Sequence, residues 1–158
     1  MPRRAPPPPA PIDYATLADL RYHVRRFLRA REVIARAAGV EPQQYLVLLQ
    51  IKGLAGRGVP TIGVLAERLQ INHHAAVQLV DRLARRGMVE RQPGGRDRRE
   101  VVVRLRPAGE TILRRVVRDS IDELTTEGPR LVSSLNRLIK RSTRGRARPR
   151  PGPRKATR

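Results

Sequence analysis

The chain has 158 residues, with 34 lysines and arginines against 14 aspartates and glutamates, and therefore a formal net charge of +20. A charge of this size does not specify a fold, but it attracts polyanions such as nucleic acid. The sequence contains no cysteine, which excludes disulfide frameworks, thiolate metal sites and thiol-based redox switches. The length suits one domain of ordinary size.

The sequence shows no segment for export or membrane insertion. No apolar run approaches the ~18 residues that span a bilayer. Residues 1–11 carry two arginines followed by prolines, where a signal peptide would be apolar. We therefore expect a disordered proline-rich arm at 1–11 and a cytoplasmic, nucleoid-associated protein with no membrane partner.

Positive charge is concentrated at the C-terminal end. Residues 140–158 hold nine basic residues and no acidic one, whereas residues 107–139 hold five of each. The last segment has several prolines and glycines and no apolar periodicity, which predicts a disordered basic tail at 141–158. This tail either attracts phosphates without sequence preference or simply aids solubility.

Apolar residues recur at helical spacing in the first half of the chain. They predict a helix over 12–38, which Gly39 ends. Pro42 fits the first turn of a second helix, whose apolar run from Tyr45 to Ile51 predicts burial before it stops at glycines.

Two shorter helices follow, and each begins at a residue suited to capping. Thr61 begins a helix that runs to Leu69, and Asn72 begins a helix that runs to Arg86. Gly87 ends the second one. Two helices joined by so short a turn match the spacing of a helix-turn-helix.

The pattern then changes to β-prone runs at 88–91 and 101–105, which flank a basic, glycine-containing loop at 92–100. A long helix begins at Pro107. We expect Gly128–Pro129 to break it, leaving a separate last helix over 131–139. The predicted fold is mainly α with a small β-hairpin wing.

A helix-turn-helix followed at once by a basic hairpin predicts a DNA-binding module. The second helix would enter the major groove and place its first turns against base edges. An arginine at the hairpin tip would enter the adjacent minor groove, where the potential is most negative.

Four motifs support this interpretation: Leu65-Ala66-Glu67-Arg68-Leu69, Leu79-Val80-Asp81-Arg82-Leu83, Gly87-Met88-Val89-Glu90-Arg91, and Asp97-Arg98-Arg99 followed by Val103-Arg104-Leu105 and Gly109. Together they resemble the DNA-binding lobe of the MarR (multiple antibiotic resistance regulator) family. With the flanking helices, the resemblance covers residues 12–140.

The resemblance implies a winged helix-turn-helix transcriptional regulator with a DNA-binding lobe at 41–106. It also implies dimerisation helices at 12–38 and 107–140, and a wing in which Asp97 holds Arg99 for the minor groove. The expected partners are double-stranded DNA and a second copy of the chain, bound to half-sites about one helical turn apart.

The resemblance also implies a small aromatic effector, bound between the dimerisation helices and the lobe, that relieves repression. Candidate residues for such a pocket are Tyr22, His23, Arg26 and Tyr45, although each also fits an ordinary core or surface position.

The recognition helix departs from the family pattern. Ala75, Val77 and Gln78 stand where the family often has hydroxyl residues and an arginine, and Arg106 replaces a usual threonine. The base preference of this helix is therefore not implied by the family.

The candidate DNA-binding residues lie in two groups. The helix group is His73, His74, Ala75, Gln78 and Arg82, and the wing group is Arg96, Asp97, Arg98 and Arg99. Gln78 has the reach for a bidentate contact with adenine, or is an ordinary exposed polar residue. The histidines contact DNA or merely cover the helix end, and the arginines at 82, 85 and 86 touch phosphates, pair with Asp81 or face solvent.

No pattern supports catalysis, a cofactor or a metal. The acidic residues are scattered among arginines, and no Ser-His-Asp or paired-carboxylate spacing occurs. His73 and His74 point about 100° apart on a helix, so they do not chelate one ion as neighbours.

Two rival functions remain: an architectural protein that coats DNA without choosing a sequence, and a winged module that binds a protein.

The wing assignment predicts that Arg99→Ala weakens DNA binding strongly, because the minor groove loses its inserted guanidinium. A gel-shift titration of a bound duplex measures the change. An unchanged affinity would remove the wing from the interface.

Overall fold

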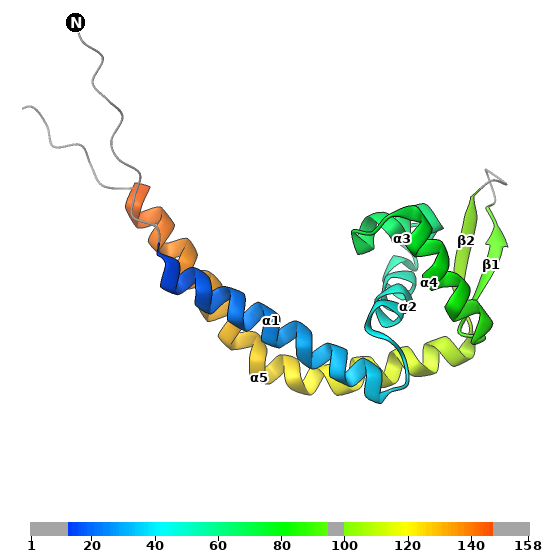
Figure 1. Cartoon of the computed structure of the whole chain (residues 1–158), viewed down its shortest axis with the longest axis horizontal. Helices are drawn as coiled ribbons and strands as arrows, with labels where there is room; N and C mark the ends of the chain where they lie inside the picture. Colours follow the sequence, from blue (N-terminus) through cyan, green and yellow to red (C-terminus); the bar gives the residue numbers. More distant parts are fainter. Residues whose placement is uncertain (1–12, 95–99, 147–158) are drawn as a thin grey trace, which may run out of the picture. The chain divides into compact units, whose positions relative to one another are not determined.

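The computed structural model describes residues 13–94 and 100–146, and the chain divides into two units. Residues 28–125 form one unit, here called the lobe, and residues 13–27 with 126–146 form the other, here called the helical pair. The elements in chain order are α1 (Tyr14–Ala37), α2 (Pro42–Leu54), α3 (Ile62–Leu69), α4 (His73–Arg85), β1 (Val89–Pro93), β2 (Val101–Leu105) and α5 (Pro107–Arg146) (Figure 1). A mainly helical fold with one hairpin was predicted and is confirmed.

The core of the lobe is built from apolar side chains that its helices and hairpin share. The predicted burial of the second helix is confirmed, since Val47 and Leu48 of α2 are inaccessible to solvent. They pack in one cluster with Leu65 of α3, Leu83 of α4 and Val103 of β2. Each such side chain contributes roughly 1.5–3 kcal/mol through its removal from water.

The two capping residues act as the sequence predicts. The Thr61 hydroxyl accepts a hydrogen bond from the Val64 amide at 3.3 Å, and the Asn72 side chain accepts one from the Ala75 amide at 2.7 Å. Between them, Gln70 ends α3 in the left-handed conformation, with φ at 56°. The turn between α3 and α4 is therefore tight and closed by local bonds, as a helix-turn-helix requires.

The hairpin pairs β1 and β2 in antiparallel register, with Val89 opposite Leu105 and Arg91 opposite Val103. The strand β2 is also tied to the start of α3, because the Val103 amide donates to the Pro60 carbonyl at 2.9 Å. The hairpin is thus held against the helix-turn-helix on one edge.

The expected break at Gly128–Pro129 is wrong, since α5 runs without interruption and contains Pro129. Proline has a φ that fits a helix but cannot donate to the carbonyl four residues back. That carbonyl belongs to Thr125, which lies on the exposed surface where water can replace the missing donor. The helix also continues through Arg146, so the first six residues of the predicted basic tail are helical.

In the helical pair, the first half of α1 lies antiparallel to the last part of α5 (Figure 1). Glu127 is buried and pairs with Arg26 of α1 at 3.1 Å and with Arg130 at 3.0 Å. These two ion pairs hold the turn of α5 that contains the proline.

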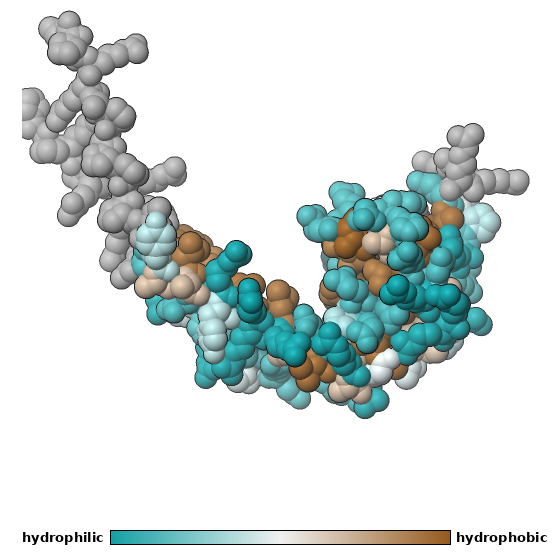
Figure 2. All heavy atoms as spheres, viewed as in Figure 1, coloured by the Kyte–Doolittle hydropathy of each residue, from teal (hydrophilic) through white to brown (hydrophobic). Residues whose placement is uncertain are grey.

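The helical pair also exposes large apolar side chains. In Figure 2 brown, apolar residues lie along this unit. Six large aliphatic or aromatic side chains of this unit are at least 41% exposed: Tyr14, Leu17, Tyr22, Val132, Leu135 and Ile139. Among the described residues, no helix combines the length and apolar character needed to cross a membrane.

The beginning of α5 packs directly against the backbone before the hairpin. The Arg106 amide donates to the Met88 carbonyl at 3.0 Å. A Cβ atom added at Gly109 would lie 2.2 Å from the same carbonyl oxygen, which is far inside van der Waals contact. Only glycine fits there without a shift of the backbone.

We therefore expect Gly109→Ala to lower the free energy of unfolding by at least about 2 kcal/mol, because α5 or the hairpin must move. Chemical denaturation measures the change. The matched control is Gly53→Ala in α2, where no atom lies within 4 Å of the added carbon, and where alanine should stabilise the helix by up to about 1 kcal/mol. Equal effects at the two glycines would contradict the close contact.

Candidate nucleic-acid interface

The helix α4 has one buried and one open face. Ala76, Val80 and Leu83 are buried in the lobe. The helical period places His74, Gln78 and Arg85 on the opposite side, where all three are exposed. The open face therefore presents polar and basic groups without disturbing the core.

The first turns of α4 contain the bonded pair His74 and Gln78. The amide nitrogen of Gln78 lies 3.0 Å from Nε2 of His74. His73 is exposed beside this pair, and Ala75 is half-buried at the edge of the open face. All four candidate residues of the first two turns thus lie on or beside one surface.

The arginines of α4 have different surroundings. Arg82 and Arg85 are exposed and have no ion-pair partner within the described residues. Arg82 also borders a pocket of about 380 Å³ against the first turn of α2. Arg86 donates to Gln44 at 3.0 Å and to the Gly39 carbonyl at 2.6 Å, so it serves the lobe's structure.

An ion pair between Asp81 and Arg91 joins α4 to the hairpin. Side chains directly opposite in an antiparallel pair project to the same face. Arg91 is opposite Val103, whose side chain is buried in the core, so Arg91 faces the helices and reaches Asp81. The sequence analysis considered only the arginines of the same helix as partners of Asp81. Arg91 was missed because its position beside Asp81 depends on the register of the strands.

The other face of the hairpin carries a polar chain of contacts. Arg104 donates to Gln92 at 2.7 Å, and Gln92 donates to Glu90 at 2.5 Å. The strands close with a bond from the Gly94 amide to the Glu100 carbonyl at 2.8 Å. The wing candidates Arg96, Asp97, Arg98 and Arg99 lie outside the described residues.

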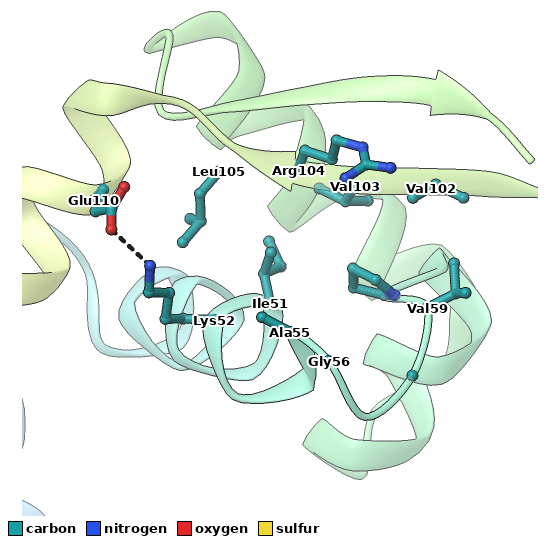
Figure 3. A pocket seen from close by; sticks show the side chains of 12 residues that line it. Ile51, Lys52, Ala55, Gly56, Val59, Val102, Val103, Arg104, Leu105 and Glu110 are labelled. Atoms are coloured by element: carbon teal, nitrogen blue, oxygen red, sulfur yellow. Dashed lines mark hydrogen bonds and ion pairs between the residues drawn. The ribbon is translucent and has the colours of Figure 1, made fainter.

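A separate pocket of about 450 Å³ lies between the end of α2, the loop after it and β2 (Figure 3). Lys52 and Glu110 meet at its margin, with Nζ and Oε1 2.6 Å apart. The hydrogen bond and the positive charge of Lys52 lower the pKa of Glu110. The Glu110 carboxylate therefore remains ionised at neutral pH, and the ion pair links α2 to the start of α5.

The four candidates for an effector pocket differ in their surroundings. Tyr45 is buried in the core of the lobe, and burial raises its pKa. Tyr22, His23 and Arg26 belong to the helical pair, where the rings of Tyr22 and His23 contact edge to face at 5.3 Å. Nδ1 of His23 is buried without a hydrogen-bond partner in the described part of the chain.

The described residues contain no cluster of three or more histidines, aspartates or glutamates able to hold a metal ion.

The cap of α4 gives a test of the local structure. We expect Asn72→Ala to lower the free energy of unfolding by about 0.5–2 kcal/mol, because the Ala75 amide loses its acceptor. Thermal or chemical unfolding measures this loss. Asn72→Ser keeps a capping oxygen and should remain close to the parent protein; an equal loss for serine would show that the cap is not the cause.

Comparison with known proteins finds a family match within the lobe. A model of the MarR family matches residues 38–100, from the residue after α1 to the residue before β2. No curated protein matches the sequence.

Several solved structures share the fold. A MarR family transcription regulator has a TM-score of 0.65 and 23% identity, with 85% of this chain and 89% of that chain covered. A mutant of MarR from E. coli complexed with operator DNA has a TM-score of 0.61 and 26% identity, with 77% and 89% covered. The PcaV transcriptional regulator from Streptomyces coelicolor, in complex with its natural ligand, has a TM-score of 0.56 and 23% identity, with 85% and 97% covered.

These matches confirm the resemblance noted in the sequence. Residues 38–100 match a model of the MarR family, and the chain has the winged helix-turn-helix fold of MarR-family transcription regulators over most of its length.

Proposed function

We propose that this chain is a sequence-specific DNA-binding transcriptional regulator that acts as a homodimer. Its helix α4 would lie in the major groove of the DNA, and its hairpin would follow the DNA backbone toward the adjacent minor groove.

The observation that carries the proposal is the open face of α4 beside a hairpin that is fixed to the same helix. Gln78 and Arg85 project from this face, while Ala76 and Val80 on the other side hold the helix in the lobe. The ion pair of Asp81 with Arg91 keeps helix and hairpin together. A protein that contacts two neighbouring grooves needs a fixed distance between its helix and its hairpin, because a loose hairpin would lose orientational entropy on binding.

The similarity to MarR of E. coli supports the same conclusion, since that protein was solved in complex with operator DNA. The charge of the predicted DNA-binding segment agrees, with twelve basic and six acidic residues over 41–106. Counterion release would then make the affinity fall steeply with salt.

Dimerisation is supported by the exposed apolar side chains of the helical pair, such as Tyr14, Tyr22 and Val132. Exposed apolar groups of this size, gathered on two neighbouring helices, favour burial against another surface. A symmetric partner is the commonest occupant and suits a palindromic operator.

We further propose that the protein represses its target and that a small molecule relieves repression. The support is the similarity to PcaV, which was solved with its natural ligand. Because Tyr45 is buried in the lobe core, it would line an effector site only if that core opened.

The rival function is DNA coating without sequence choice, which the nine basic residues of 140–158 favour. Selection of bound duplexes from a random pool, followed by competition with unrelated DNA, separates the two. A regulator should enrich one motif and prefer it by ~10³ or more over unrelated DNA. Binding without enrichment would favour coating, and no duplex binding at physiological salt would favour a protein-binding module.

A charge variant tests the orientation of α4. We expect Arg85→Gln to reduce the slope of log affinity against log salt by about 0.9, the value for one lost phosphate contact. The matched control is Arg115→Gln on α5, which removes one exposed arginine outside α4 and should leave the slope unchanged. Equal slopes for Arg85→Gln and the parent protein would place α4 outside the interface.

A further inference from the structure

The contact between His74 and Gln78 carries an inference about base recognition, which rests on the proposed function. Both side chains are exposed on the open face of α4, one helical turn apart, and the Gln78 amide nitrogen lies 3.0 Å from Nε2 of His74. The flanking residues Ala75 and Val77 offer no side-chain hydrogen bond. Within the described residues, the imidazole is the only side-chain partner of this amide.

The chemistry of the two groups fixes their roles. An amide nitrogen only donates, so Nε2 of His74 must accept, and the imidazole proton then lies on Nδ1. The Gln78 amide is thereby held with its nitrogen toward His74. One N–H remains available beside the carbonyl oxygen, and the two point away from the imidazole.

We propose that His74 is a positioning residue that presents the donor–acceptor edge of Gln78 to an adenine in the major groove. Adenine offers N7 as an acceptor and its N6 amino group as a donor, which the remaining N–H and the Oε1 of Gln78 complement. Guanine offers two acceptors, N7 and O6, and does not complement this edge. An amide turned the other way would direct its NH₂ group outward and favour guanine.

The inference gives His74 a function other than phosphate attraction. In its contact with Gln78 the imidazole accepts a hydrogen bond at Nε2. Its contribution is the orientation of Gln78, so changes at residue 74 should alter base preference and total affinity in different ways.

The test uses the full chain and the motif enriched from the random pool. Gln78→Ala first identifies the base pair that Gln78 reads, as the position where preference is lost. For the parent protein, replacing adenine there should weaken binding about 5- to 150-fold, the range for one good bidentate contact. Dissociation constants for the four duplexes that differ at this base pair measure the preference.

Two substitutions of His74 test whether residue 74 must accept a hydrogen bond from Gln78 or may donate one to it. His74→Gln keeps an acceptor oxygen and should keep the adenine preference. His74→Lys has only donors, so it should turn the Gln78 carbonyl inward and move the preference toward guanine, while its charge maintains or raises affinity for DNA in general. Arg115→Gln on α5, outside the candidate interface, is the control and should leave the preference unchanged.

The histidine tautomer gives a second readout that needs no DNA. Long-range ¹H–¹⁵N spectra of the free protein should show the His74 proton on Nδ1. In Gln78→Ala this tautomer should lose its preference, because the bond to Nε2 is gone. Both side chains are exposed, so these variants should unfold at the same midpoint as the parent.

The outcomes distinguish the two proposals. Failure to enrich any motif would contradict sequence-specific binding, and the inference with it. An enriched motif whose adenine preference survives His74→Lys, or an imidazole proton found on Nε2, would overturn the role of His74 alone.

Discussion

The arrangement of the lobe depends on which face of α4 is buried in the core and which is open to solvent. Ala76, Val80 and Leu83 anchor the helix in the core, and the cap at Asn72 fixes where its first turn begins. This burial determines the rotation of the helix about its own axis, and a small rotation would carry Gln78 away from the open side. The apolar stripe thus sets which side chains reach a ligand, although none of its members would touch one.

Packing into the same core also fixes the position of the hairpin. Its register places Val103 in the core and Arg91 on the same face, so that packing and the ion pair with Asp81 fix one strand position together. A shift by one residue would turn both side chains to the other face. Gly109 limits the base of the hairpin from the other side, because α5 approaches the Met88 carbonyl without room for a Cβ atom.

The sequence predicts local features well and long-range ones poorly. Thr61 and Asn72 were predicted as caps because the capping bond spans only three residues. The predicted break at Gly128–Pro129 is wrong, since an ion pair between Arg26 of α1 and Glu127 holds that turn of α5, and periodicity within one segment does not reveal it. The bond between α4 and Arg91 was missed for a similar reason, because it requires the strand register. The wing tip, predicted from its arginines, lies outside the described residues.

Arg86 gives the lobe a mechanical connection. Its guanidinium bonds the carbonyl of Gly39, between α1 and α2, and the side chain of Gln44 in the first turn of α2. A displacement of the α1–α2 junction would therefore either break two hydrogen bonds or draw the C-terminal end of α4 with it. The Arg86 side chain thus ties the C-terminal end of α4 to the α1–α2 junction, so a movement of this junction would reach α4 without any change in the apolar core.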